Sequence, residues 1–358
     1  MLNTLHGSYE FDNQLYIRDD GSHTSFLEEV VQLRKGRYSR GLDGLICFWA
    51  NELSYDKLNL FLTTLIGACP LSGNGLEEYV ISRAVQISED QVANSLNASA
   101  EVAVEVGVVE KIDLYDEKTS EVILMMDDVS VKAQKPHKKI AREEDDVKRI
   151  GTTIALISTK TDTYDTFTEG IDTKGNIIYP IETAILDKVA EHHCQDSPLP
   201  LVAITDGAKS IRNSLTAVFG QKVCIILDWY HLQHKLSNLM SMIAPNKDIK
   251  MLYIQDIKAL LWKGDTENAL KYLNKIPKIK NKQIFDELTG YLTKHQPEII
   301  NYEKRKRANK VIGSGRVEKA NDIIVAKRQK KKGMAWSKVG SKALAIVKIF
   351  YKQNNNIA

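Results

Sequence analysis

The spacing of apolar residues divides the chain into a helical part, a strand-rich part and a second helical part. Residues 1–44 show weak periodicity and scattered turn residues, so we expect a loosely structured lead-in. Between 45 and 118 apolar residues recur at the spacing of a helix, which predicts a helical domain.

Residues 76–99 (LEEYVISRAVQISEDQVANSLNAS) predict two helices with a tight break near Ile87–Ser88. Ser88 fits an N-cap, and Gln91 three residues later completes a capping box. Two helices joined in this way can form a helix-turn-helix that binds the DNA major groove. The second helix contains no Lys or Arg, and a plain helical bundle is an equally good interpretation.

After residue 118 short strands alternate with helices. Three strands that can pair as a meander are followed by two buried strands joined through helices, which predicts an α/β fold with a mixed sheet covered by helices. The predicted strands span 121–131, 149–159, 163–171, 200–205 and 222–227, with helices at 181–194 and 208–220. From Trp229 onward the pattern is helical.

The distribution of charge along the chain says more about possible partners than the overall composition does. The 358 residues are 43% hydrophobic and 27% charged, as in ordinary globular proteins, with a net charge of +3. Between 301 and 358, however, 16 Lys and Arg oppose three acids, so this segment carries +13 and the first 300 residues carry −10. A basic segment on an acidic body favours a polyanionic partner such as nucleic acid, and a solvated lysine-rich helix face is the alternative.

The cysteines and the hydropathy pattern indicate a cytoplasmic protein. Cys47, Cys69, Cys194 and Cys224 lie far apart without Cys-x-x-Cys spacing, which favours reduced thiols over disulfides or a zinc site. The first residues lack the pattern of a signal peptide, and the longest uncharged window, 58–76, is interrupted by Gly, Pro and Asn. We therefore expect no membrane segment.

Three acidic residues stand where a sheet protein can assemble a metal site. Asp127 is expected to end the first strand, Asp206 ends the fourth, and Glu318 lies about one turn into a helix that starts near Ser314. Carboxylate oxygens are the ligands that Mg²⁺ prefers. An Asp-Gly turn without a metal role is the alternative for Asp206. Neighbouring strand residues point to opposite faces, so only one of Asp127 and Asp128 can face the site, and we favour Asp127.

The segment ILDWYHLQHK adds a further candidate pair. Asp228 ends the fifth strand and His231 follows three residues later, so at helical spacing the two side chains share a face beside the same strand ends. A histidine that forms hydrogen bonds in the interior is the alternative. We expect His234 either to support the site residues without contacting the metal or to have no role in the site. Residues 192–194 (HHC) are expected to end a helix rather than to bind a metal.

Four segments, TDGAKSIRN, ILDWYHLQHKL, GSGRVEKA and KKKGMAWSKVGSKALAIVK, resemble DDE-type transposases of bacterial insertion sequences. The resemblance is to the ISKra type, which is related to Mutator-like transposases, and it covers about 121–348. It implies an RNase H-like mixed sheet with flanking helices and a helical insertion after the fifth strand. The catalytic core is then expected in two parts, 119–235 and 309–358, with the insertion at 236–308 and the helical domain before them.

The resemblance also implies the site residues and the reaction. Asp127, Asp206 and Glu318 fall on the catalytic, metal-binding triad, with Asp228 and His231 as further catalytic residues beside it. The implied reaction is cleavage and transfer of DNA strands at the ends of an insertion sequence. The implied cofactor is a pair of Mg²⁺ ions, for which Mn²⁺ can substitute.

The implied partners are double-stranded DNA, from element ends and target, and further copies of the chain in a homodimer or larger assembly, at the nucleoid. Basic residues after Ser314 are expected to bind DNA phosphates, and Trp336 either stacks on a base or packs in the interior. The predicted DNA contacts are Arg316, Lys319, Lys327, Arg328, Lys330, Lys331, Lys332 and Trp336. The alternatives are a nuclease or resolvase that cuts without joining, and a metal-independent DNA-binding protein derived from an inactivated transposase.

Overall fold

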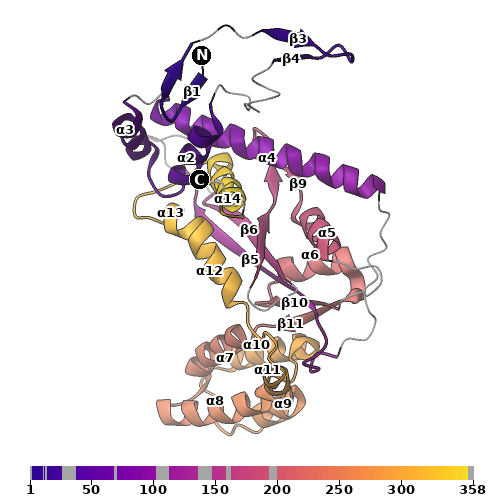
Figure 1. Ribbon diagram of the computed structural model, residues 1–358. Helices are drawn as coiled ribbons and strands as arrows, with labels where there is room; N and C mark the ends of the chain where they lie inside the picture. The colour runs from indigo at the N-terminus through magenta and orange to yellow at the C-terminus, as the bar shows by residue number, and fades with distance from the viewer. Residues whose placement is uncertain are drawn as a thin grey trace.

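A five-stranded mixed sheet lies at the centre of the fold (Figure 1). The computed structural model describes residues 2–10, 12, 14–25, 38–67, 71–101, 113–135, 147–158, 163–192 and 200–353. The strands of the sheet are β5 (Val122–Lys132), β6 (Arg149–Ser158), β7 (Asp165–Thr168), β10 (Leu201–Thr205) and β11 (Val223–Leu227). They lie in the order β11-β10-β5-β6-β7, with β5, β10 and β11 parallel to one another and β6 antiparallel to both β5 and β7.

Helices cover both faces of this sheet, which explains why the parallel strands are almost continuous apolar runs. On one face α5 (Ile181–His192) and α6 (Lys209–Phe219) pack against Leu124, Ala203 and other residues of the same parity. On the other face α12 (Gly315–Asn321) and α14 (Lys338–Gln353) pack against the sheet. A π-helical turn (Asp322–Ala326) and α13 (Lys327–Gln329) follow α12 directly.

The helical stretch after the fifth strand forms a separate group of helices at the bottom of Figure 1. Its core includes Trp229, whose ring lies 4.8 Å from Trp262 and 4.9 Å from Tyr302, between ring centroids. The helices are α7 (Trp229–Ile243), α8 (Lys247–Trp262), α9 (Thr266–Asn274), α10 (Lys282–Lys294) and α11 (Tyr302–Arg307). The prediction of helices after Trp229 is confirmed.

The N-terminal part differs from its prediction in two ways. Instead of a loose lead-in, the described residues form two short hairpins, and a helix starts at Arg40. The strands are β1 (Leu2–Thr4), β2 (Gly7–Tyr9), β3 (Leu15–Ile17) and β4 (His23–Ser25), and the helices are α2 (Arg40–Ala50), α3 (Tyr55–Ile66) and α4 (Gly73–Glu101).

The predicted helix-turn-helix break at Ile87–Ser88 is wrong, because α4 is one continuous helix. The Ser88 hydroxyl does not cap a new helix but donates to the carbonyl of Ala84, at 2.8 Å. The same hydroxyl accepts from the backbone N–H of Ile171, at 3.0 Å. Ser88 therefore joins the middle of α4 to the edge of the sheet region.

Two strand predictions also need correction. Asp127 lies in the middle of β5 rather than at its end, because pairing with β6 continues to Lys132. The predicted third strand divides into β7 and β8 (Gly170–Ile171), and β8 turns away to pair with β9 (Ile177–Tyr179). None of the described helices is long and apolar enough to cross a membrane.

A fully buried arginine ties the end of the helical group to the start of β5. Arg305 is 0% exposed, and its guanidinium pairs with the Glu121 carboxylate. It also donates to the carbonyls of Leu114, at 3.1 Å, and Val311, at 2.8 Å. The Lys310 ammonium lies 3.1 Å from the same carboxylate. These contacts fix the chain between α11 and α12.

We expect Glu121→Ala to lower the free energy of unfolding by about 3–5 kcal/mol, because Arg305 would stay buried without its counter-charge. Chemical denaturation followed by circular dichroism measures this difference. The matched control is Glu303→Ala, which removes the partner of the exposed Arg307, at 2.9 Å, and should cost about 0.5 kcal/mol or less. Equal destabilisation of the two variants would contradict a dominant role for the buried pair.

Candidate active site

Three aspartates lie at one level on three neighbouring parallel strands. Ile204 of β10 pairs with Met125 of β5, so the same register continued by two residues places Asp206 beside Asp127. β10 and β11 pair up to the last residue of each, which places Asp228 on the other side of Asp206. Because side chains alternate across a strand, all three point to the face covered by α12.

Asp127 and its neighbour Asp128 point to opposite faces of β5. The Asn321 side-chain amide, on α12, donates to Asp127 Oδ2 at 2.7 Å. Asp128 instead accepts from the hydroxyl of Thr153, at 2.6 Å, on the adjacent strand. Asp127 is therefore the one of the two that shares a face with Asp206, in agreement with the preference stated above for this residue.

The surroundings of Asp127 disfavour its negative charge. Burial raises the pKa of Asp127, and the nearby carboxylate of Asp206 raises it further. Hydrogen bonds from the Asp128 backbone and Asn321 oppose these effects without cancelling them. Two neighbouring half-buried carboxylates are oxygen donors of the kind that a divalent cation could bind.

The Asp228 carboxylate is fully buried and bonded to two distant parts of the chain. Asp228 is 0% exposed and caps α7 by accepting from the backbone N–H groups of Tyr230 and His231. Its second oxygen accepts from both the backbone N–H and the hydroxyl of Ser314, directly before α12. Burial acts to raise the pKa of Asp228, but the contact with the His231 ring and the hydrogen bonds from Ser314 and the His231 backbone outweigh it and lower this pKa.

Glu318 lies next to Asp228 and His231. His231 Nδ1 is 3.4 Å from Asp228 Oδ2 and 3.7 Å from Glu318 Oε1. One ligand atom from each of these three residues lies within 4.8 Å of the others, a spacing that one metal ion can bridge. Glu318 keeps 51% of its side chain exposed, so it faces solvent from the edge of the site. We refer to Asp127, Asp206, Asp228, His231 and Glu318 as the acid cluster.

The histidine of the acid cluster is a cation near neutral pH. Its contact with the Asp228 carboxylate raises the pKa of His231 to about 8, with the charges of Glu318 and Asp206 acting in the same direction and burial opposing them. His234, one turn later, is exposed and contacts only Asn238 among the polar groups of α7. The preference for His231 over His234 is thus consistent with the geometry.

Sequence reasoning missed several residues that shape the acid cluster. Asn321 follows Glu318 by three residues, and this spacing alone places both on one face of α12. His295 is 1% exposed and packs beneath the Asp206–Gly207 turn, where a Cβ on Gly207 would lie 2.7 Å from its ring. Its Nδ1 contacts Glu298 and Arg212, at 2.7 Å and 2.8 Å. Nothing in the local sequence around His295 indicates this proximity.

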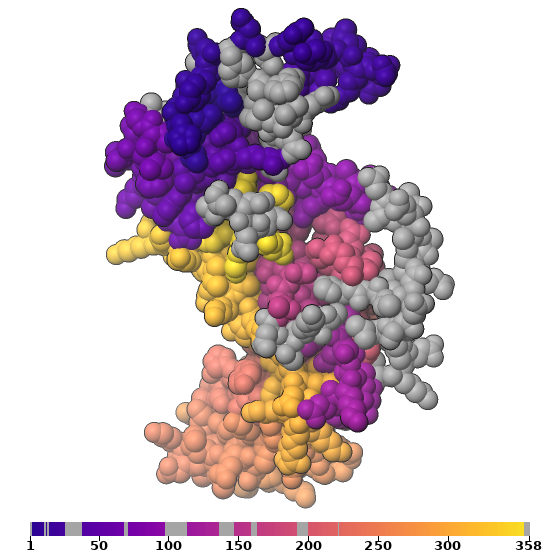
Figure 2. Space-filling view, in the orientation of Figure 1, coloured from indigo at the N-terminus to yellow at the C-terminus, as the bar shows by residue number. Residues whose placement is uncertain are grey.

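The predicted DNA contacts divide into exposed and buried residues. Arg316, Lys319 and residues 330–332 are exposed, and Figure 2 shows the C-terminal segment, in yellow, on the surface between the N-terminal helices and the lower helices. Lys327 is exposed but pairs with Glu52 at 2.9 Å.

Arg328 and Trp336 do not fit the prediction of DNA contact, because both are interior residues. Arg328 is 2% exposed, donates to the carbonyl of Ala50 at 3.1 Å and lies 4.8 Å from the centre of the Trp336 ring. Trp336 is 8% exposed, and its indole N–H donates to the carbonyl of Gln329 at 3.0 Å. Packing, the second interpretation of Trp336, is the one that the structure supports.

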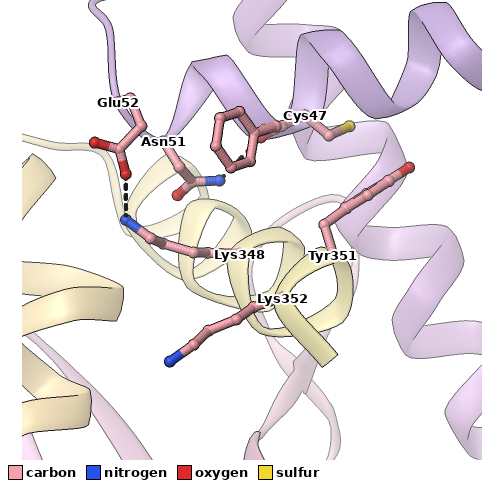
Figure 3. A pocket seen from close by; sticks show the side chains of 7 residues that line it. Cys47, Asn51, Glu52, Lys348, Tyr351 and Lys352 are labelled. Carbon is pink, nitrogen blue, oxygen red and sulfur yellow. Dashed lines mark hydrogen bonds and ion pairs between the residues drawn. The ribbon is translucent and has the colours of Figure 1, made fainter. Parts of the chain in front are cut away.

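A cavity of about 320 Å³ lies between α2 and α14, and it shares no residue with the acid cluster (Figure 3). Lys348 and Glu52 pair at its edge, at 3.1 Å, with Asn51 and Tyr351 beside them. The thiol of Cys47, in its wall, donates to Asp43 Oδ1 at 3.6 Å. Cys69, Cys194 and the neighbouring His193 lie outside the described residues.

Comparisons with known proteins identify a family but no relative of established function. The description "Uncharacterised protein family (UPF0236)" matches residues 1–357. No curated protein matches the chain. Among solved structures, the Drosophila P element transposase strand transfer complex is similar with 10% identity and a TM-score of 0.26. This match covers 93% of this chain and 84% of that chain, but a TM-score this low does not establish a shared fold.

We expect the imidazole of His231 to titrate with a pKa of about 8 in metal-free protein, above its ordinary value of 6.5. A raised pKa means that protonation stabilises the fold. The stabilisation is complete below about pH 6.5 and disappears as the pH rises through 8. The difference in unfolding free energy between wild type and His231→Gln should therefore shrink over this range.

Histidine NMR titration and denaturation at several pH values measure the two effects. His234→Gln, at the exposed ring one turn later, is the matched control and should keep the pH dependence of the wild type. A His231 resonance that titrates below pH 6.5 would contradict the ion pair with Asp228.

Proposed function

The chain belongs to the UPF0236 family, and we propose that it is a DDE-type DNA transposase that cleaves and transfers DNA strands at the ends of an insertion sequence. The observation that carries this proposal is that Asp127 and Asp206 lie side by side on the face of the sheet covered by α12, the helix that bears Glu318. These residues are far apart in the sequence, so their position beside the Asp228–His231 pair results from the fold and not from sequence proximity.

The architecture supports the proposal. An RNase H-like fold of the resembled type needs a mixed sheet with flanking helices and a helical insertion after the fifth strand. The chain has a five-stranded mixed sheet, and α7 to α11 stand between β11 and the helix that bears Glu318. We accordingly assign the core to 119–235 and 309–358, with 236–308 as the insertion.

The donor set fits Mg²⁺, or Mn²⁺ in its place. Asp127, Asp206 and Glu318 would hold the metal through carboxylate oxygens. Burial, and after it the charge of Asp206, raises the pKa of Asp127, and a bound divalent cation would offset both effects. When bound, two such ions activate the attacking oxygen and stabilise the leaving oxygen in phosphoryl transfer.

Asp228 and His231 have different roles in this proposal. Asp228 has both oxygens occupied by backbone and side-chain donors, so it positions α7 and α12 rather than contacting substrate. His231 turns Nδ1 towards Asp228 and Glu318, which leaves its Nε2–H to donate to a DNA phosphate oxygen. Its positive charge at neutral pH favours binding of that phosphate.

Double-stranded DNA is the partner in this proposal, and a dimer or larger assembly would bring two element ends together. Exposed cations on α12, Arg316 and Lys319, flank the acid cluster and would contact the phosphates on either side of the cut. A nuclease or resolvase would use the same acid cluster but release cut ends without joining them.

Mg²⁺ should raise the melting temperature of the wild type through binding to the folded state alone. At about 100 times the dissociation constant the expected stabilisation is ~2.7 kcal/mol. Asp206→Asn should abolish most of this shift, while being more stable than wild type without metal because its repulsion with Asp127 is removed. Differential scanning fluorimetry with and without Mg²⁺ measures both effects.

Asp128→Asn is the matched control for this experiment. It removes the same charge beside Asp127, but Asp128 points to the opposite face and should leave the Mg²⁺ shift unchanged. If Asp128→Asn loses the Mg²⁺-induced rise in melting temperature while Asp206→Asn keeps it, the proposed metal ligands are excluded.

Nicking and joining of a labelled duplex that carries the inverted repeats of the element test the reaction itself. Wild type should nick with Mg²⁺ or Mn²⁺ and form strand-transfer products, and Asp206→Asn should be slower by about 10²–10³-fold or more. Equal nicking by the two proteins would exclude a catalytic role for Asp206. Cut products without any joined product would favour the nuclease or resolvase.

A further inference from the structure

A second basic surface lies at the end of β5, away from the acid cluster. A groove of about 740 Å³ runs between the end of the β5–β6 pair at Lys132 and Arg149 and the segment that enters α14. Its lining includes the cations Lys135, Arg149, Lys338 and Lys342, and no Asp or Glu among the described residues. We call it the basic groove.

We propose that the basic groove binds the phosphate backbone of duplex DNA that extends from the acid cluster. The inference rests on the proposed function, because it assigns the path of the DNA whose strand is cut. Of the residues involved, Lys135, Arg149 and the α14 residue Lys338 were not among the predicted DNA contacts.

Three of the four cations are available to a ligand. Lys342 is 6% exposed and pairs with Glu169 in the interior, so it is neutralised from within. Lys135, Arg149 and Lys338 are exposed, and Arg149 donates through Nη1 to the Ser130 hydroxyl at 3.0 Å, which orients its guanidinium. A concave surface whose described lining carries cations and no acids attracts a polyanion, and binding releases the polyanion's counterions.

The floor of the basic groove is fixed before any ligand arrives. Trp336 donates its backbone N–H to the carbonyl of Lys132 at 2.9 Å, and its carbonyl accepts from Gln134 at 2.8 Å. The chain before α14 is thus added to the end of β5 as a short bridge. Opposite it, Gly151 offers no side chain to fill the space.

A short length of duplex could span the two sites. Ala133, at the start of the basic groove, follows Asp127 by six residues along one strand, or about 20 Å at ~3.3 Å per residue. Successive phosphates of one DNA strand advance about 3.4 Å along the helix axis, so a straight line of this length corresponds to about six base pairs. Because α12 and the π-helical turn cover β5 between the two sites, the duplex would pass over these helices. Lysine and arginine contacts to phosphates carry no base information, so this surface would hold DNA without reading its sequence.

The test measures DNA binding in EDTA, where cleavage does not contribute. The groove variant is K135A/R149A/K338A, and the matched control is K258A/K263A/K278A, which removes three exposed cations from the insertion. Binding of a fluorescent duplex of about 30 base pairs is followed by anisotropy between about 50 and 200 mM salt. The groove variant should reduce the slope of log affinity against log salt by about 2.7, or about 0.9 for each phosphate that the protein no longer neutralises.

Each result decides between the possibilities. The proposal is supported when the slope falls in the groove variant while the control keeps the wild-type slope and both variants keep the wild-type melting temperature. An unchanged slope in the groove variant, an equal fall in the control, or groove-dependent binding of single-stranded RNA in preference to duplex DNA would overturn it. If the wild type does not nick DNA but the groove variant still shows the reduced slope, the proposed reaction is overturned and DNA binding by the basic groove is retained.

Discussion

The buried carboxylate of Asp228 is the constraint on which the arrangement of the acid cluster depends. A charge removed from water is costly unless hydrogen bonds replace its hydration, and here the donors come from the start of α7 and from Ser314. Satisfying Asp228 therefore requires the chain to return to the strand ends after the whole helical group. Since α12 begins directly after Ser314, the same bonds determine where Glu318 stands.

The second determinant is the register of the parallel strands. Parallel pairing aligns equivalent positions of β5, β10 and β11, so residues of one parity that follow the apolar runs meet on one face. Asp127 differs from the other two because β5 continues beyond it to Lys132, so Asp127 lies within a strand rather than at its end. Asn321 supplies a hydrogen bond there, and this contact links α12 to the middle of the sheet. Two independent sets of bonds thus hold α12 against the acid cluster.

The strands could be predicted because apolar runs such as LVAIT and VCIIL are continuous and end abruptly in polar residues. The break at Ser88 was predicted from a local capping pattern, but nothing between 76 and 101 interrupts a helix, and the Ser88 hydroxyl finds partners within α4 and across the fold. Local patterns also gave no indication that Asp228 would be buried by Ser314 or that His295 would lie under Gly207, because these contacts depend on how distant segments pack.

The last 58 residues carry a high positive charge, but the fold leaves only part of this charge available to a polyanionic partner. Several of its cations are internal: Arg305 pairs with Glu121, Lys342 with Glu169 and Lys348 with Glu52. These residues join the segment to the rest of the protein and are not free to bind phosphates. The exposed cations that remain include those of α12, which flank the acid cluster, and Lys338, which lines the basic groove, and others lie on α11 and at the end of α14. A partner that contacts both the acid cluster and the basic groove must be long and negatively charged, as a nucleic acid backbone is.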